Sequence, residues 1–366
     1  MTATTIFIIA GGLYCVQCAT FIYALQRFRP PVASRYEPFV SIVMAARNEE
    51  KNIVACLDSL VRVEYPADKL EIIVVDDGST DSTLHLLKER AAQYSIVKII
   101  NARQDIDHLR GKANAIAQGI DVSRGEVILM TDADCIVPPT WVKGTVERYT
   151  DDVGVVAGLT LLRPSGWFAG MQSLDWAYIL AVASAAMSLR KPLSCIGNNF
   201  SFRKSAYDAI GGYRKVPFSV TEDFALFKAM TRSGRWGYRY PFSRKTLVFS
   251  NACQTMRSLY RQKRRWGVGG KDMSLVGLSI MAVAFCFHGM LLCGPFVGIS
   301  LPAYAAFFVA KLLLDGFLLA IPLSRTEQLS QFRYFLAFEL YFIPYVIILP
   351  FAVFLGGRVR WKGRSY

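Results

Sequence analysis

The sequence predicts an α/β protein whose doubly wound sheet is flanked by transmembrane helices at both ends of the chain. Short apolar runs alternate with segments of helical periodicity, which is typical of strand–helix–strand units. Two of these runs end in paired carboxylates, and the carboxyl edge of such a sheet is where ligands bind. Long, mostly apolar stretches near both ends of the 366 residues are sufficient to cross a bilayer core of about 30 Å.

The first uncharged stretch covers Thr5–Leu25 and is followed at once by Arg27 and Arg29. No basic residue precedes it and no small-residue cleavage site is evident, so it resembles an uncleaved anchor with its positive flank in the cytoplasm. After Met273 the chain is again mostly apolar, and further spans are expected there. They cover about Leu275–Val297, Ile299–Leu323 and Phe332–Leu355.

These features divide the chain into an anchor over 1–28, a cytoplasmic α/β domain over 29–270, a membrane region over 271–357 and a basic tail over 358–366. Pro30 and Pro31 open the first linker. We expect a multi-pass protein of a bacterial inner or plasma membrane. Three spans after a cytoplasmic domain would place the basic tail outside, against the positive-inside tendency, unless one C-terminal segment is re-entrant.

The chain carries 42 Lys and Arg against 28 Asp and Glu, a formal net charge of +14. A basic surface suits nucleic acid, an anionic leaflet or a phosphorylated ligand. No nucleic-acid motif is present, and a basic cluster directly precedes an apolar stretch, which favours the leaflet and phosphate. That cluster is Arg257, Arg261, Lys263, Arg264, Arg265 and Lys271. The 3 His and 8 Cys show no zinc or catalytic-triad spacing and no disulfide framework.

The first predicted strand is Val40–Ala46, and Arg47–Glu50 is expected to begin the following helix. The second predicted strand, Glu71–Val75, runs directly into Asp76 and Asp77. Like charges at a strand end repel each other unless a ligand or a cation is near. This acidic turn is therefore a candidate binding site for a nucleotide.

The apolar run Val127–Met130 leads to Asp132 and Asp134, two carboxylates spaced i, i+2. Hard oxygen ligands of this kind suit Mg²⁺ or Mn²⁺ bridging a diphosphate. An acidic pair in a loop is also often only a turn or a helix cap, and both readings stay open from this pair alone. Lys112 stands near the start of the preceding helix, where it would meet a phosphate.

Two later segments complete the domain. Val153–Leu161 is strand-like, and Glu222 with Asp223 begins a predicted helix, where an acidic first turn also complements the helix dipole.

Trp167–Leu189 is apolar enough to suggest a span, but spanning would put Asp134 and Asp223 on opposite sides of the bilayer. We therefore expect an amphipathic helix that is buried in the domain or lies on the membrane surface.

In their order along the chain, five motifs resemble those of the membrane-bound, inverting glycosyltransferases of family 2. They are Asp76-Asp77-Gly78-Ser79, Gly111-Lys112-Ala113-Asn114-Ala115, Asp132-Ala133-Asp134, Thr221-Glu222-Asp223 and Gln262-Lys263-Arg264-Arg265-Trp266, the last matching QxxRW. Each motif is weak alone, whereas the ordered set is specific. The resemblance covers roughly Val40 to Gly270 and implies the GT-A fold. Ser250–Thr255 departs from it by lacking the Glu and Pro that many relatives carry.

The resemblance implies transfer of a sugar from a nucleotide-sugar, here a UDP-sugar, to a hydroxyl with inversion. The nucleotide-sugar would be bound by Asp76, Asp77, Lys112, Asp132 and Asp134, with Asp134 also holding Mg²⁺ or Mn²⁺. Asp223 would take the proton of the acceptor, and Glu222 and Arg265 would complete the catalytic set. Gln262, Arg265 and Trp266 would contact the diphosphate and the acceptor.

For the acceptor we expect a membrane lipid, because Trp266 and the basic cluster place the site beside a bilayer surface. The resemblance extends to ceramide glucosyltransferase, which supports a lipid, and also to processive polysaccharide synthases. A small synthase of the chitin, hyaluronan or cellulose kind is therefore the alternative. A non-catalytic membrane scaffold is a second alternative. The sequence fixes neither the donor sugar nor the oligomeric state.

Overall fold

The computed structural model describes residues 1–27, 36–103, 105–106, 108–270, 273–357, 360–361 and 364–365. The expected linker at Pro30 and Pro31, Lys271 of the basic cluster and most of the basic tail lie outside the described residues. The strands are β1 Val40–Ala46, β2 Leu70–Asp76, β3 Val97–Asn101, β4 Val127–Asp132, β5 Val153–Ala157, β6 Thr160–Leu162, β7 Phe200–Arg203, β8 Gly237–Arg239, β9 Val248–Ser250, β10 Arg360–Trp361 and β11 Arg364–Ser365. The helices are α1 Ala3–Gln26, α2 Ile53–Val61, α3 Thr83–Ala91, α4 Lys112–Asp121, α5 Trp141–Val146, α6 Trp167–Ser188, α7 Lys204–Ala209, α8 Glu222–Arg232, α9 Met256–Gly269, α10 Leu275–Cys293, α11 Leu301–Arg325 and α12 Phe335–Phe354.

The main sheet has seven strands in the order β3-β2-β1-β4-β7-β5-β8. The first four are parallel, and β7 runs antiparallel to both β4 and β5. Strands that are buried on both faces are rich in apolar residues, as in Ile42–Ala46 of β1 and Val127–Met130 of β4. The predicted doubly wound mixed sheet is confirmed.

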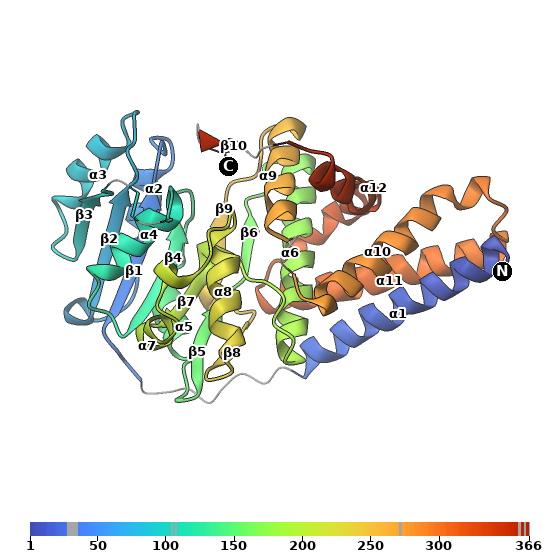
Figure 1. Cartoon of the computed structure of the whole chain (residues 1–366), viewed down its shortest axis with the longest axis horizontal. Helices are drawn as coiled ribbons and strands as arrows, with labels where there is room; N and C mark the ends of the chain where they lie inside the picture. Colours follow the sequence, from blue (N-terminus) through green and yellow to red (C-terminus); the bar gives the residue numbers. More distant parts are fainter. Residues whose placement is uncertain are drawn as a thin grey trace.

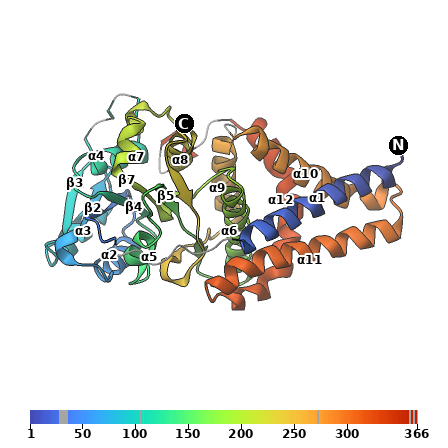
Figure 2. The same cartoon turned by 90° about the horizontal axis from the view of Figure 1, so that it is seen from below.

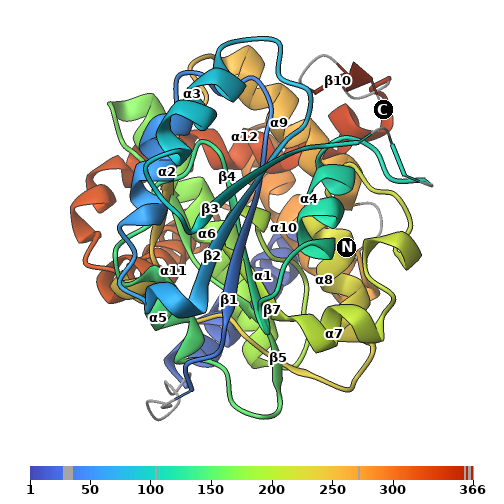
Figure 3. The same cartoon turned by 90° about the vertical axis from the view of Figure 1, so that its left-hand side faces the viewer.

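Helices cover both faces of this sheet: α2, α3 and α5 lie on one side, and α4, α7 and α8 on the other (Figure 3). The alternation of β1 explains the arrangement, because Ile42 packs in the cluster that contains Leu57 of α2, and Val43 packs in the cluster that contains Ile116 of α4. Alternate residues of one strand are apolar on both faces of the sheet, and each face is therefore covered by helices.

Two predicted elements differ in the structure. Arg47–Glu50 is a loop, and α2 begins only at Ile53. Asn48 has a φ of 52°, which breaks a helix, and its side-chain oxygen accepts a hydrogen bond from Thr80 N at 2.9 Å. The single strand expected over 153–161 is two strands, of which β5 joins the main sheet and β6 pairs with β9.

Four described helices are long and apolar enough to cross a membrane: α1, the segment that contains α10, α11, and the segment that contains α12. They confirm the helices predicted for the four apolar stretches. Helices α1, α10 and α11 extend together from one end of the α/β domain, whereas α12 lies nearer the domain, against α6 and α9 (Figures 1 and 2). Within them α1 packs against α10 and α11, and α10 packs against α12.

Helix α6 lies between the sheet and the long helices (Figure 1). It is buried on nearly all sides, since it contacts β6 and β8 as well as α1, α11 and α12. It is not among the described helices that are apolar enough to span. The expectation of a helix buried in the domain is confirmed, but the expected amphipathic character is wrong because protein covers its opposite faces.

Candidate active site

The acidic strand ends meet at one edge of the sheet. Strand β1 lies between β2 and β4, with Ala46 in register with Asp76 and Ala45 in register with Asp132. The chain continues from β2 into Asp77, whose backbone carbonyl accepts a hydrogen bond from Arg47 Nη1 at 2.5 Å. The parallel topology thus brings together carboxylates that are more than fifty residues apart in sequence.

Lys112 joins the strand ends to the acidic turn of α8. Its Nζ lies 2.6 Å from Asp132 Oδ1 and 2.9 Å from Glu222 Oε1. Gly111, with a φ of 57°, makes the left-handed turn that starts α4 and aims Lys112 at this site. Burial alone would lower the pKa of the Lys112 ammonium, but Asp132, Glu222 and Asp223 raise it above its usual range. Lys112 is therefore a fixed positive charge.

Asp223 lies in the first turn of α8. Its carboxylate accepts hydrogen bonds from Gly197 N at 2.6 Å and from Phe224 N at 2.8 Å. A Cβ at Gly197 would lie 2.8 Å from this side chain, so the backbone approaches Asp223 closely only because residue 197 is glycine. Burial, and then the neighbouring Glu222, raise the pKa of Asp223 to about 6, although Lys112 lowers it. A carboxylate of this kind is a proton acceptor suited to neutral pH.

Asp134 follows β4 and accepts a hydrogen bond from Ser250 Oγ at 3.1 Å. Burial, and then the carboxylates of Asp132 and Glu49, raise its pKa to about 6. This excess of negative charge on hard oxygen atoms fits a divalent cation such as Mg²⁺ or Mn²⁺. Among the described residues, however, no group of three or more His, Cys, Asp or Glu side chains is close enough to hold a metal ion by itself.

Helix α9 carries the QxxRW residues along one side of the site. It begins with a capping box between Thr255 and Ser258, which fixes its first turn. Lys263 forms an ion pair with Asp175 of α6, and both side chains are buried. Trp266 packs its ring 5.2 Å from the ring of Trp176, also on α6. Helix α9 is thus fastened to α6 by a buried charge pair and an aromatic contact.

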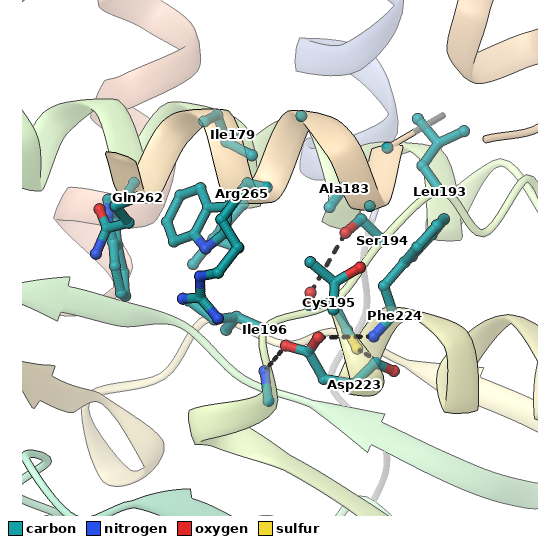
Figure 4. A pocket seen from close by; sticks show the side chains of 18 of the residues that line it. Ile179, Ala183, Leu193, Ser194, Cys195, Ile196, Asp223, Phe224, Gln262 and Arg265 are labelled. Carbon is teal, nitrogen blue, oxygen red and sulfur yellow. Dashed lines mark hydrogen bonds between the residues drawn. The ribbon is translucent and has the colours of Figure 1, made fainter. Parts of the chain in front are cut away.

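One cavity of about 600 Å³ unites these groups. Figure 4 shows Asp223 of α8 on one side of the cavity, with Arg265 of α9 and Ile179 and Ala183 of α6 on the facing side. The predicted site residues that line the cavity are Asp77, Lys112, Asp132, Asp134, Glu222, Asp223, Gln262, Arg265 and Trp266. Asp76 is the exception: it is buried beside the cavity, and its Oδ2 accepts a hydrogen bond from Ser79 N at 3.2 Å.

Some residues that line the cavity were not predicted from the sequence. Arg47 and Glu49 border it from the loop after β1, and Ser250 from the end of β9. Arg47 and Glu49 could have been predicted, because the polar loop after the first strand lies at the same sheet edge as the acidic pairs. Apolar side chains of α6, α10 and α12 form much of the rest of the lining, so the cavity continues from the carboxylates to the long helices.

Comparisons with known proteins identify related sequences and one similar structure. The model for glycosyl transferase family 2 matches residues 41–211, and the model for glycosyl transferase family group 2 matches residues 127–355. Poly-beta-1,6-N-acetyl-D-glucosamine synthase of Staphylococcus aureus (strain NCTC 8325 / PS 47) is 26% identical over 276 residues, which are 74% of this chain and 64% of that protein. Beta-monoglucosyldiacylglycerol synthase of Nostoc sp. (strain PCC 7120) is 30% identical over 241 residues, 64% of this chain and 49% of that protein.

Among solved structures, a mannosyltransferase from Pyrobaculum calidifontis in complex with GDP-Man and Mn²⁺ has the same fold. Its TM-score is 0.62 at 20% sequence identity, and the match covers 93% of this chain and 98% of that one. The chain therefore shares its overall fold with a structure of similar extent.

Proposed function

Because the chain belongs to glycosyltransferase family 2, we propose that it transfers a sugar from a nucleotide-sugar to a hydroxyl of a membrane lipid, with inversion at the anomeric carbon. The observation that supports this most is the single cavity, which has carboxylates and Lys112 at one end and apolar membrane helices at the other. Such a cavity suits a charged, water-soluble donor and an amphiphilic acceptor at the same time.

The donor would lie at the carboxyl edge of the sheet. Asp76 and Asp77 are proposed to hold the base and ribose of a UDP-sugar, with Asp132 assisting. Arg265 offers two parallel N–H donors to the diphosphate, and Lys112 adds a positive charge beside it. Asp134 would hold Mg²⁺ or Mn²⁺, with the diphosphate supplying further oxygen ligands. When bound, the cation neutralises charge on the departing diphosphate.

The acceptor hydroxyl would approach Asp223 from the apolar side of the cavity. Asp223 accepts the proton of this hydroxyl as its oxygen bonds to the anomeric carbon and the bond to the diphosphate breaks. Glu222 is held by Lys112 at 2.9 Å, which keeps the acidic turn in place. Trp266 offers a flat apolar face for the sugar or for the edge of the acceptor.

A polysaccharide acceptor is the second candidate, and the similarity to the S. aureus polysaccharide synthase favours it. Against it stands the lining of the cavity beyond Asp223, where α10 contributes Ile280, Ala284 and Phe285 and α12 contributes Val346 and Leu349. A growing polysaccharide presents hydroxyl groups that such walls leave without hydrogen bonds. The Nostoc relative, whose name describes a glycolipid synthase, favours the lipid.

Incubation of the purified protein with radiolabelled nucleotide-sugars and total membrane lipid tests the proposal. Donors carrying UDP and GDP should be compared, with glucose, galactose, N-acetylglucosamine and mannose as the sugars. We expect organic-extractable label that Asp223→Asn abolishes. Label found in glycosidase-sensitive polymer without added lipid would replace this proposal with the synthase. Absence of transfer with every donor would favour the non-catalytic scaffold.

A further inference from the structure

We propose that the acceptor lipid enters the active site sideways from the bilayer, through an opening between α10 and α12 at the ends that adjoin the α/β domain. We call this opening the lateral portal and define it by Leu278 and Met281 of α10 and Phe354 of α12. The inference rests on the proposed lipid acceptor. It adds the route by which that lipid reaches Asp223.

The portal residues border the cavity and are also exposed to the surroundings of the protein. Each lines the cavity that contains Asp223. Each is also exposed on the outside of the protein, by 42% for Leu278, 43% for Met281 and 74% for Phe354. A side chain that borders a cavity and is also this exposed stands at its mouth. The cavity therefore opens through the side of the membrane helices, in addition to the polar end where the donor would bind.

Ring contacts limit the opening on the side away from the domain. Phe285 of α10 lies 6.2 Å from Phe351 of α12, and His288 lies 5.5 Å from Phe342, measured between ring centroids. These contacts close α10 against α12. Between them and the domain, the inner surface is formed by α6, with Trp176 among its lining residues.

Helix α12 is held firmly on its side of the portal. Arg264 Nε of α9 donates a hydrogen bond to the carbonyl of Ala352 at 3.1 Å. A Cβ at Gly267 would lie 2.4 Å from Val353, so α9 and α12 pack too closely there for any larger residue. The QxxRW helix therefore serves both the diphosphate side of the cavity, through Arg265, and the wall of the portal.

The chemistry of this opening identifies its occupant. Its three defining residues are apolar, and they lie on helices that are long and apolar enough to cross a membrane. An amphiphile with a hydroxyl on its head group would leave its chains among these residues while the head reaches the carboxylates. Its chains would then never pass through water, which would be unfavourable for them. A water-soluble sugar or polymer needs no opening of this kind.

Met281→Trp tests the portal by filling it, and Leu292→Trp is the matched control. Leu292 lies on the same helix and is 46% exposed, but it is not among the lining residues. The acceptors are dioleoylglycerol in phosphatidylcholine vesicles and short-chain dihexanoylglycerol in solution. We expect Met281→Trp to lower transfer to dioleoylglycerol at least tenfold more than transfer to dihexanoylglycerol, with no such difference for Leu292→Trp. Equal effects on the two acceptors, or the same pattern in the control, would overturn the portal.

A second measurement is independent of the identity of the acceptor. Phosphatidylcholine with a photoactivatable acyl chain should label α6 inside the cavity in the wild type and in Leu292→Trp, and much less in Met281→Trp. Absence of label on α6 in the wild type would overturn the portal. If the wild type uses neither glycerolipid, diacylglycerol is not the acceptor, and this labelling alone decides whether the portal admits lipid.

Discussion

Lys112 and Lys311 each lie between two carboxylates, but in surroundings that differ completely. Lys112 Nζ contacts Asp132 at 2.6 Å and Glu222 at 2.9 Å at the edge of the cavity, and its side chain is 15% exposed. Lys311 Nζ contacts Asp315 at 2.8 Å and also Glu339, and its side chain is 0% exposed. The same three charges thus occur once beside a ligand cavity and once sealed among the long helices.

The sealed cluster connects several helices. Asp315 Oδ1 accepts hydrogen bonds from the hydroxyls of Tyr14 on α1, at 2.7 Å, and Tyr178 on α6, at 3.1 Å. Glu339 brings in α12, so the cluster around Lys311 holds four helices together. Lys112 borders the cavity, where we propose that it exchanges a carboxylate for a phosphate oxygen. The two lysines have the same kind of partners, so access to the cavity is what distinguishes a lysine proposed to bind a ligand from one that stabilises helix packing.

The largest effect is expected from Asp223→Asn, on the cavity side. Loss of the proton acceptor should lower the transfer rate on the order of 10²- to 10⁴-fold, while nucleotide binding and the unfolding temperature barely change. Transfer rates and nucleotide titrations on the same preparation check this. Near wild-type turnover, or loss of nucleotide binding together with the rate, would leave Asp223 as a helix cap only.

Lys311→Met should act on stability instead. Removing one partner leaves buried carboxylates without compensation, and the expected loss of unfolding free energy is about 3–5 kcal/mol. The control is Lys311→Met combined with Asp315→Asn and Glu339→Gln, which removes all three charges and keeps an acceptor for the two tyrosines. Thermal unfolding in detergent should show recovery in the triple variant. Equal instability of both variants would contradict a role for charge balance.

Chelation should stop turnover, and Mg²⁺ or Mn²⁺ should restore it. Asp134→Asn should weaken donor binding at least ~10-fold as well as the rate, because a neutral amide is a poorer ligand for a hard cation. Donor titrations with and without the cation measure this difference. Full activity of the purified protein in chelator would refute the metal site.

The pH dependence should give a smaller and graded effect. Asp223 must be ionised to accept a proton, and its pKa is raised to about 6. The rate should therefore fall about tenfold per pH unit below that value. Lys112 lowers the pKa of Asp223, so Lys112→Met should move this acid limb to higher pH, while Lys112→Arg keeps the charge and the position. If the acid limb of the pH–rate profile stays in place in Lys112→Met, Lys112 does not set the pKa of Asp223.

The sequence predicted the sheet and the carboxylate end of the cavity for one physical reason. Short apolar runs such as Val127–Met130 that end in polar residues are typical of buried strands, and parallel strands bring their acidic ends to one edge. It failed where tertiary contacts decide the local structure. Asn48 takes a left-handed conformation because of its bond to Thr80, and α6 is covered on opposite faces.

The cluster around Lys311 was not predicted from the sequence, for a related reason. Lys311 and Asp315 are spaced i, i+4, a visible signal in an apolar helix, but Glu339 comes from another helix. Similarly, nothing in the spacing of the sequence pairs Asp175 of α6 with Lys263 of α9. Pairs between helices depend on packing that a single sequence does not reveal.

The central claim is direct displacement of the diphosphate by a lipid hydroxyl, with Asp223 as the base. The most direct test is the configuration of the new glycosidic bond in the organic-extracted product, measured from the coupling of the anomeric proton by NMR. Starting from an α-linked UDP-sugar, a single in-line displacement predicts a β-linked glycolipid. An α-linked lipid product would mean retention of configuration, which a single in-line displacement cannot give, and would contradict the role assigned to Asp223.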